Sequence, residues 1–156
     1  MASKAKILII DDETDMVENC AGILGEFGYK CLTETKSDDA LELISQVRPD
    51  VILTDLKMPG KDGIDILKAA KRIDSEIVVI LFTAYGTIPS AVEAIKEGAF
   101  DYIQKPFSVD ELRIAVERGL NQKRLRKENR SLRQQLEDRY GFDQIVGKSQ
   151  AMQQVF

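Results

Sequence analysis

Short apolar runs rich in β-branched residues alternate with amphipathic stretches through the first 120 residues, and this alternation limits the possible folds more than any other feature. The apolar runs resemble strands, and the stretches between them repeat apolar residues at helical spacing. Strict alternation of this kind predicts an α/β domain in which helices cover both faces of a parallel sheet. The predicted strands are Lys6–Ile10, Lys30–Thr35, Val51–Thr54, Ile77–Thr83 and Asp101–Gln104. The predicted helices are Thr14–Phe27, Ser37–Val47, Gly63–Ile73 and Pro89–Gly98, and a fifth begins at Ser108.

Two of the runs, Ile7–Ile10 and Ile77–Phe82, are apolar without interruption, which is typical of strands buried on both faces. We therefore expect a flavodoxin-like, five-stranded parallel sheet with strand order 2-1-3-4-5. In such open sheets, ligands bind beyond the carboxyl ends of the strands. The residues that follow the strands are thus the first place to look for chemistry.

Charged and polar side chains gather at four of these strand ends. They are Asp11 and Asp12 after the first strand, Asp55 after the third, Thr83 at the end of the fourth and Lys105 after the fifth. Carboxylates that share a crevice repel one another unless a cation joins them, and Mg²⁺ prefers oxygen ligands. A carboxylate can attack phosphorus, while a lysine and a hydroxyl can contact phosphoryl oxygens. The pattern predicts phosphoryl transfer onto an aspartate.

Each of these residues also has a simpler interpretation. Asp11 and Asp12 are suitable caps for the first helix, and Asp55 precedes a Pro-Gly turn. Lys105 is equally a solvated lysine, and Thr83 a plain strand end. Each simple interpretation is plausible by itself. It is much less plausible that all four apply at the same end of the same sheet, so we favour the functional interpretation. A scaffold that binds ions without being modified is the alternative from another class.

Four motifs make the region from Lys6 to about Leu120 resemble the response-regulator receiver domain of two-component systems, which has a CheY-like fold. The motifs are Ile9–Glu13, Asp55–Gly60, Thr83–Ala84 and Lys105–Phe107. The resemblance implies that Asp55 is the phosphorylated residue and that a sensor histidine kinase is the phosphodonor. The sequence contains no histidine, so a phosphohistidine must be carried by another protein.

The resemblance implies a magnesium cofactor at the same place. Asp12, helped by Asp11, is expected to hold Mg²⁺ together with Asp55. The backbone carbonyl of Lys57 is expected to complete the ligand set.

The resemblance also implies a switch. Thr83 and Lys105 are expected to contact the phosphoryl oxygens, and Tyr102 matches the rotating aromatic residue of the family. An aromatic side chain that merely packs at a strand edge explains Tyr102 equally well. The surface that reads out the switch is expected to lie between about Ile88 and Val116.

A change in charge near residue 120 marks a second region. Residues 1–120 carry 14 Lys/Arg and 22 Asp/Glu, a net charge of −8, whereas residues 121–139 carry 7 and 3, a net charge of +4. Ser108 and Glu111 have capping-box spacing, and helical sequence continues to Tyr140–Gly141. We expect a receiver domain at 1–120 and a helical linker at 121–140.

The linker carries a short heptad pattern. Leu125 and Leu132 occupy d positions, and Asn129 and Leu136 occupy a positions. A single Asn at an a position of a leucine seam specifies parallel dimers, so a homodimer is expected, with a solvated charged helix as the alternative. The basic run 123–127 lacks aromatic residues and a helix-turn-helix, and we expect it to make no direct contact with nucleic acid.

The C-terminal residues contain Gly147-Lys-Ser149, but a phosphate loop needs another glycine where Phe142 stands. The stretch Ile145–Met152 instead resembles the start of the AAA+ domain in NtrC-like activators of sigma-54 RNA polymerase. We therefore expect residues 141–156 to begin a truncated AAA+ domain, with DNA-binding and ATPase domains absent from this fragment. A nucleotide hydrolase is the disfavoured enzymatic alternative, and we expect no enzyme here beyond self-phosphorylation and dephosphorylation chemistry.

The amino-acid composition excludes several classes of function. The lack of histidine excludes Ser-His and Cys-His catalysis. Cys20 and Cys31 lack metal-site spacing and are expected to be free, largely buried thiols. The apolar runs are far shorter than the about 20 residues of a transmembrane helix, so we expect no membrane contact and a cytoplasmic location.

Overall fold

The computed structural model describes residues 5–84 and 88–147, and the chain divides into two compact units between Asn121 and Gln122. The first unit contains the sheet and most of the helices. Its elements follow the predicted alternation, with small shifts at the ends. They are β1 (Lys6–Ile10), α1 (Thr14–Glu26), β2 (Lys30–Glu34), α2 (Ser37–Val47), β3 (Val51–Asp55), α3 (Gly63–Ile73), β4 (Val78–Thr83), α4 (Ile88–Lys96), β5 (Asp101–Gln104) and α5 (Val109–Gly147).

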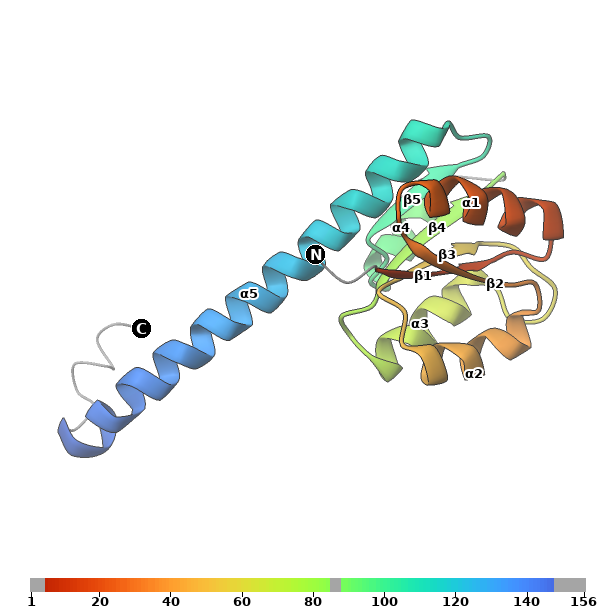
Figure 1. Cartoon of the computed structure of the whole chain (residues 1–156). Coiled ribbons are helices and arrows are strands. Elements are labelled where there is room, and N and C mark those ends of the chain that lie inside the picture. Colours follow the sequence, from red (N-terminus) through yellow and green to blue (C-terminus); the bar gives the residue numbers. More distant parts are fainter. Residues whose placement is uncertain (1–4, 85–87, 148–156) are drawn as a thin grey trace. The chain divides into compact units, whose positions relative to one another are not determined.

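The sheet is five-stranded and parallel, with strand order β2-β1-β3-β4-β5 (Figure 1). This is the predicted flavodoxin-like order. The chain reverses its direction of travel across the sheet between β1 and β3, so the carboxyl ends of these two strands border the crevice in which such folds place their sites. In the central strands β3 and β4 every residue is buried, and for β4 this agrees with its uninterrupted apolar run.

Two hydrophobic clusters lie on opposite faces of the sheet. One joins α2, α3 and α4 to the sheet and includes Leu8, Ile52 and Leu81. The other joins α1 and the first turns of α5 and includes Ile9 and Phe82. Strand residues alternate between the clusters because successive side chains of a strand point to opposite faces. Both faces of the sheet are therefore covered.

Local sequence signals fix several helix ends. Asp62 and Asp65 form a capping box at α3, with Asp65 N–H donating to Asp62 Oδ1 over 2.9 Å. Ser108 and Glu111 form the predicted capping box at α5, in which Glu111 N–H donates to Ser108 Oγ over 3.0 Å. Gly98 follows α4 with φ +111°, a conformation that glycine adopts without steric cost.

The end of α5 differs from the prediction. We expected helical sequence to stop near Tyr140–Gly141, but the helix continues to Gly147. A glycine inside a helix costs only about 1 kcal/mol relative to alanine, which is too little to end a helix whose neighbours favour it. The described helices include none that is long and apolar enough to cross a membrane.

Candidate functional site

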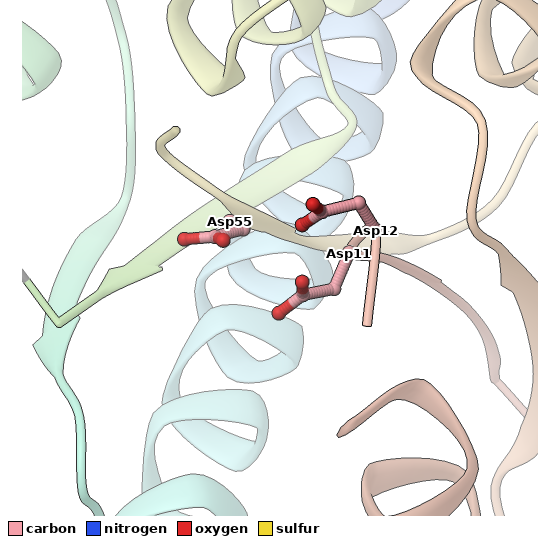
Figure 2. Close-up of side chains that lie close together, drawn as sticks. All are labelled: Asp11, Asp12 and Asp55. Atoms are coloured by element: carbon pink, nitrogen blue, oxygen red, sulfur yellow. The ribbon is translucent and has the colours of Figure 1, made fainter. Parts of the chain in front are cut away.

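Three carboxylates meet at the carboxyl end of the sheet. Asp11 and Asp12 directly follow β1, and Asp55 is the last residue of the neighbouring strand β3. One carboxylate oxygen from each lies within 4.8 Å of the other two (Figure 2). Asp11 and Asp55 are buried, whereas Asp12 is exposed. The topology thus brings together residues that are 44 positions apart in the sequence, as predicted.

Lys105 places its ammonium group between the two buried carboxylates. Its Nζ donates a hydrogen bond to Asp11 Oδ2 over 2.9 Å and lies 3.6 Å from Asp55 Oδ2. The backbone N–H of Lys105 also donates to the carbonyl of Thr83 over 2.8 Å, which ties the residue to the end of β4. With 11% of its side chain exposed, Lys105 is a largely buried counter-ion and not the solvated lysine of the simpler interpretation.

The surroundings of the site raise the pKa of both Asp55 and Lys105. Burial and, to a lesser extent, the neighbouring charge of Asp11 raise the pKa of Asp55 from 3.8 to about 6, against the opposing effects of Lys105 and the amides of Leu56 and Lys57. Burial alone lowers the pKa of Lys105, but its hydrogen bond to Asp11 and the nearby carboxylates outweigh burial and leave that pKa raised. Lys105 is therefore charged at every ordinary pH, while Asp55 bears an incompletely compensated charge.

The simpler interpretation of the first aspartates also fails. The cap position of α1 is Glu13, whose side chain makes no capping hydrogen bond. Asp11 Oδ1 instead accepts a hydrogen bond from the backbone N–H of Glu13 over 3.0 Å, while Asp11 Oδ2 faces Lys105. Both oxygens of the buried carboxylate are thus held in place.

The other predicted site residues lie around this cluster. Thr83 is fully buried at the end of β4, beside β3. Lys57 lies two residues beyond Asp55 in the β3–α3 loop, with an exposed side chain. Tyr102 is half-buried in β5 and packs against the cluster beneath α2, α3 and α4. That packing is compatible with both interpretations of Tyr102, so its role as a switch stays a prediction.

Sequence reasoning missed one aromatic support of the site. The Nζ of Lys105 lies 5.1 Å from the centre of the Phe82 ring, and Phe107 packs against that ring with 5.8 Å between centroids. An ammonium over an aromatic face is attracted by the ring quadrupole. The sequence could have indicated this contact, because Phe82 immediately precedes Thr83. Successive residues of a strand point to opposite faces of the sheet, so the Phe82 side chain lies on the face opposite to that of Thr83.

The predicted linker residues lie in the second unit, on α5. Leu125, Leu132 and Leu136 are 57%, 58% and 51% exposed, and Asn129 is exposed as well. This exposure is compatible with both the predicted dimer seam and a solvated helix, so the dimer stays a prediction. Residues 148–156, which include most of the predicted AAA+ opening, lie outside the described residues.

The donor set of the site suits a divalent cation. Three carboxylates and one ammonium group leave a formal charge of about −2 when all are ionised. Mg²⁺ prefers oxygen ligands such as carboxylates and retains several waters, and the exposed Asp12 leaves the site open to solvent. The acidic triad is consistent with the metal site typical of receivers.

The fold and this site define a class. The chain belongs to the response regulator receiver domain family, which it matches over residues 7–117. It is 40% identical over 151 residues to the nitrogen assimilation regulatory protein NtrX of Azorhizobium caulinodans, covering 96% of this chain and 32% of that protein. It is 37% identical over 155 residues to the regulatory protein AtoC of Escherichia coli K12, covering 99% of this chain and 34% of that protein.

These relatives are NtrC-like sigma-54 activators, and the chain spans about a third of their length, at the N-terminal end. Solved structures agree with the fold. A receiver domain protein from Clostridium thermocellum aligns with a TM-score of 0.74 and 39% identity, covering 78% of this chain and 98% of that chain. The beryllofluoride-activated NtrC4 receiver domain dimer aligns with a TM-score of 0.73 and 31% identity, covering 76% and 98%.

Proposed function

We propose that the chain is a phosphorylation-controlled switch in which Asp55 accepts a phosphoryl group from a partner histidine kinase. The observation that carries the proposal is the buried Asp55 carboxylate at the end of β3, with the Lys105 ammonium 3.6 Å away and two further carboxylates beside it. Membership of the receiver family and similarity to NtrC-like regulators support the same function.

The transfer is a substitution at phosphorus. A carboxylate oxygen of Asp55 attacks the phosphorus of a phosphohistidine on the kinase; the O–P bond forms, the P–N bond breaks, and the imidazole leaves with a proton from solvent. Because the pKa of Asp55 is about 6, most of the carboxylate is ionised and nucleophilic near pH 7.5. Lys105 offsets the charge on the phosphoryl oxygens, and Thr83 donates its hydroxyl to one of them.

Mg²⁺ is the proposed cofactor. Asp11, Asp12 and Asp55 supply carboxylate oxygens, and the carbonyl of Lys57 is the fourth proposed ligand. When bound, the cation supplies the positive charge that the transferring phosphoryl group requires. The residual negative charge of the pocket attracts a divalent cation to these residues.

The proposed output is a change on one surface of the domain. A phosphoryl group on Asp55 attracts the Thr83 hydroxyl, and the space that this movement frees admits Tyr102. The surface from Ile88 to Val116 then changes. It already exposes apolar side chains suited to a partner: Val92, Ile95, Val109 and Ile114 are each 45–50% exposed.

We further propose that residues 121–140 dimerise as a parallel coiled coil and that the dimer controls AAA+ and DNA-binding domains in a longer protein. In the heptad register of Leu125 and Leu132, Glu128 occupies g and Arg133 occupies the following e position. These positions face each other across a parallel pair, so the charges favour that orientation. The beryllofluoride-activated NtrC4 receiver domain is a dimer, which supports dimerisation of the chain, whereas the linker seam rests on the heptad pattern.

Intact-mass measurement after incubation with acetyl phosphate and Mg²⁺ tests the phosphorylation. The wild type gains the mass of one phosphoryl group, Asp55→Asn gains none, and the control Asp15→Asn on α1 behaves as wild type. Labelling that persists in Asp55→Asn refutes the assignment of Asp55. A wild type that binds Mg²⁺ but is never labelled favours the ion-binding scaffold instead.

Sedimentation velocity before and after acetyl phosphate treatment tests the linker. The wild type is expected to form a dimer in at least one state, and Leu132→Asp is expected to weaken it because a charge then interrupts the seam. The control Gln134→Asp adds the same charge at the outward f position. A monomer in both states removes the dimerisation proposal.

A further inference from the structure

The β3–α3 loop, which carries Lys57, is anchored at both its base and its tip. At the base, Gly63 N–H donates to the carbonyl of Leu56 over 2.8 Å. At the tip, the hydroxyl of Ser37, the first residue of α2, donates to the carbonyl of Pro59 over 2.9 Å and accepts from Lys61 N–H over 3.0 Å. One side chain therefore holds two backbone groups that lie 22 and 24 residues away from it.

Several observations distinguish this contact from an incidental surface bond. Ser37 is 4% exposed, so its hydroxyl has little access to competing water. Gly60, between the two bonded groups, has φ +83°, and a Cβ there would approach Ser37 Oγ to 2.9 Å. The loop backbone at Gly60 packs against the Ser37 hydroxyl, and the hydroxyl both donates and accepts a hydrogen bond.

We propose that Ser37 is a positioning residue for the acidic pocket. By fixing Pro59 and Lys61, it restricts the backbone of the short segment that begins at Asp55 and contains Lys57. The proposal rests on the proposed function, because it assigns to Ser37 an effect on Mg²⁺ binding through the carbonyl of Lys57. Ser37 itself touches neither the metal nor the phosphoryl group.

Loss of the hydroxyl leaves two backbone groups without their partner. Ser37→Ala is expected to weaken Mg²⁺ binding roughly five- to tenfold, which corresponds to about the net free energy of one of the two lost hydrogen bonds. The Lys61 amide should exchange its hydrogen about tenfold faster, because the loop opens locally more often. Saturating Mg²⁺ should return the rate of phosphorylation by acetyl phosphate to within about twofold of wild type, since the chemical groups are intact.

The experiment measures the Kd for Mg²⁺ by calorimetry and amide exchange by NMR in four proteins: wild type, Ser37→Ala, Ser37→Thr and Ser45→Ala. Ser37→Thr keeps the hydroxyl and is expected to recover most of the affinity. Ser45→Ala removes an exposed hydroxyl from the same helix and is expected to change nothing. A residue with a merely structural role would lower the stability to urea while leaving the Kd unchanged.

The outcomes separate two failures. Equal Mg²⁺ affinity in wild type, Ser37→Ala and Ser45→Ala overturns the positioning role and leaves the proposed function intact. A wild type that binds no Mg²⁺ overturns both, since Ser37 then has no metal ligand to position. Weaker binding in Ser37→Ala with recovery in Ser37→Thr supports the proposal.

Discussion

Replacing Asp55 by asparagine is expected to stabilise the metal-free protein, although the residue is the proposed centre of its function. Burial and the charge of Asp11 raise the pKa of Asp55 from 3.8 to about 6. Because the folded-state pKa is the higher one, the group favours folding below pH 3.8, and this contribution is lost as pH rises through 6. A shift of about two pKa units corresponds to about 3 kcal/mol at pH 7.5.

The same calculation gives a pH profile. At pH 4.5 the cost of ionising Asp55 in the folded state is about 1 kcal/mol, and by pH 7.5 it reaches about 3 kcal/mol. Asparagine has a similar shape and never ionises, so its gain in the free energy of unfolding over wild type should grow by about 2 kcal/mol between these pH values. The dependence on pH isolates the charge from any difference in hydrogen bonding.

Equilibrium urea unfolding in EDTA at pH 4.5, 6.0 and 7.5 measures this difference. Glu18→Gln removes an exposed carboxylate of α1 and should give a difference that hardly changes with pH. Adding Mg²⁺ at pH 7.5 should stabilise the wild type more than Asp55→Asn and narrow the gap. A gain that is constant or falls with increasing pH would refute the view that Asp55 carries an uncompensated buried charge.

Three further predictions follow from contacts around the site. Lys105→Gln should lower the free energy of unfolding at pH 7.5 by about 3 kcal/mol in urea, because the fully buried Asp11 loses its ionic partner; a loss well under 1 kcal/mol would contradict the pairing. Gly63→Ala should cost about 1–3 kcal/mol in the same assay, since a Cβ would lie 2.5 Å from the carbonyl oxygen of Asp55, a backbone atom that cannot rotate away; an unchanged midpoint would show that the helix shifts freely. Cys20 should react slowly with iodoacetamide at pH 8.5 in the folded protein and quickly in urea, because burial raises the pKa of its thiol to about 11; equal rates would place the thiol in solvent.

The fold was predictable because its strongest signals are local. The uninterrupted apolar runs in β1 and β4 identify buried strands, and the alternation with helices leaves few topologies. The site followed from the topology, since parallel strands bring Asp11 and Asp55 to the same edge of the sheet. The periodicity of the apolar residues and the residues that end helices and strands were thus sufficient to predict that the carboxylates lie together.

The finer features depend on three-dimensional contacts that leave no periodic trace. The contact of Ser37 with Pro59 spans 22 residues, and the ring of Phe82 under Lys105 depends on how two strands pack. The end of α5 was misplaced because the sequence around Gly141 contains no strong stop signal. Such contacts are decided by packing, which sequence patterns record only indirectly.

The unequal distances from Lys105 separate two tasks within one cluster of charges. The ammonium lies 2.9 Å from Asp11 and 3.6 Å from Asp55, so Asp11 receives the hydrogen bond and Asp55 only part of the attraction. A nucleophile locked in a close ion pair would have to break that pair before attacking phosphorus. Asp11 therefore holds the lysine in the pocket, while Asp55 keeps the excess negative charge that a divalent cation can offset.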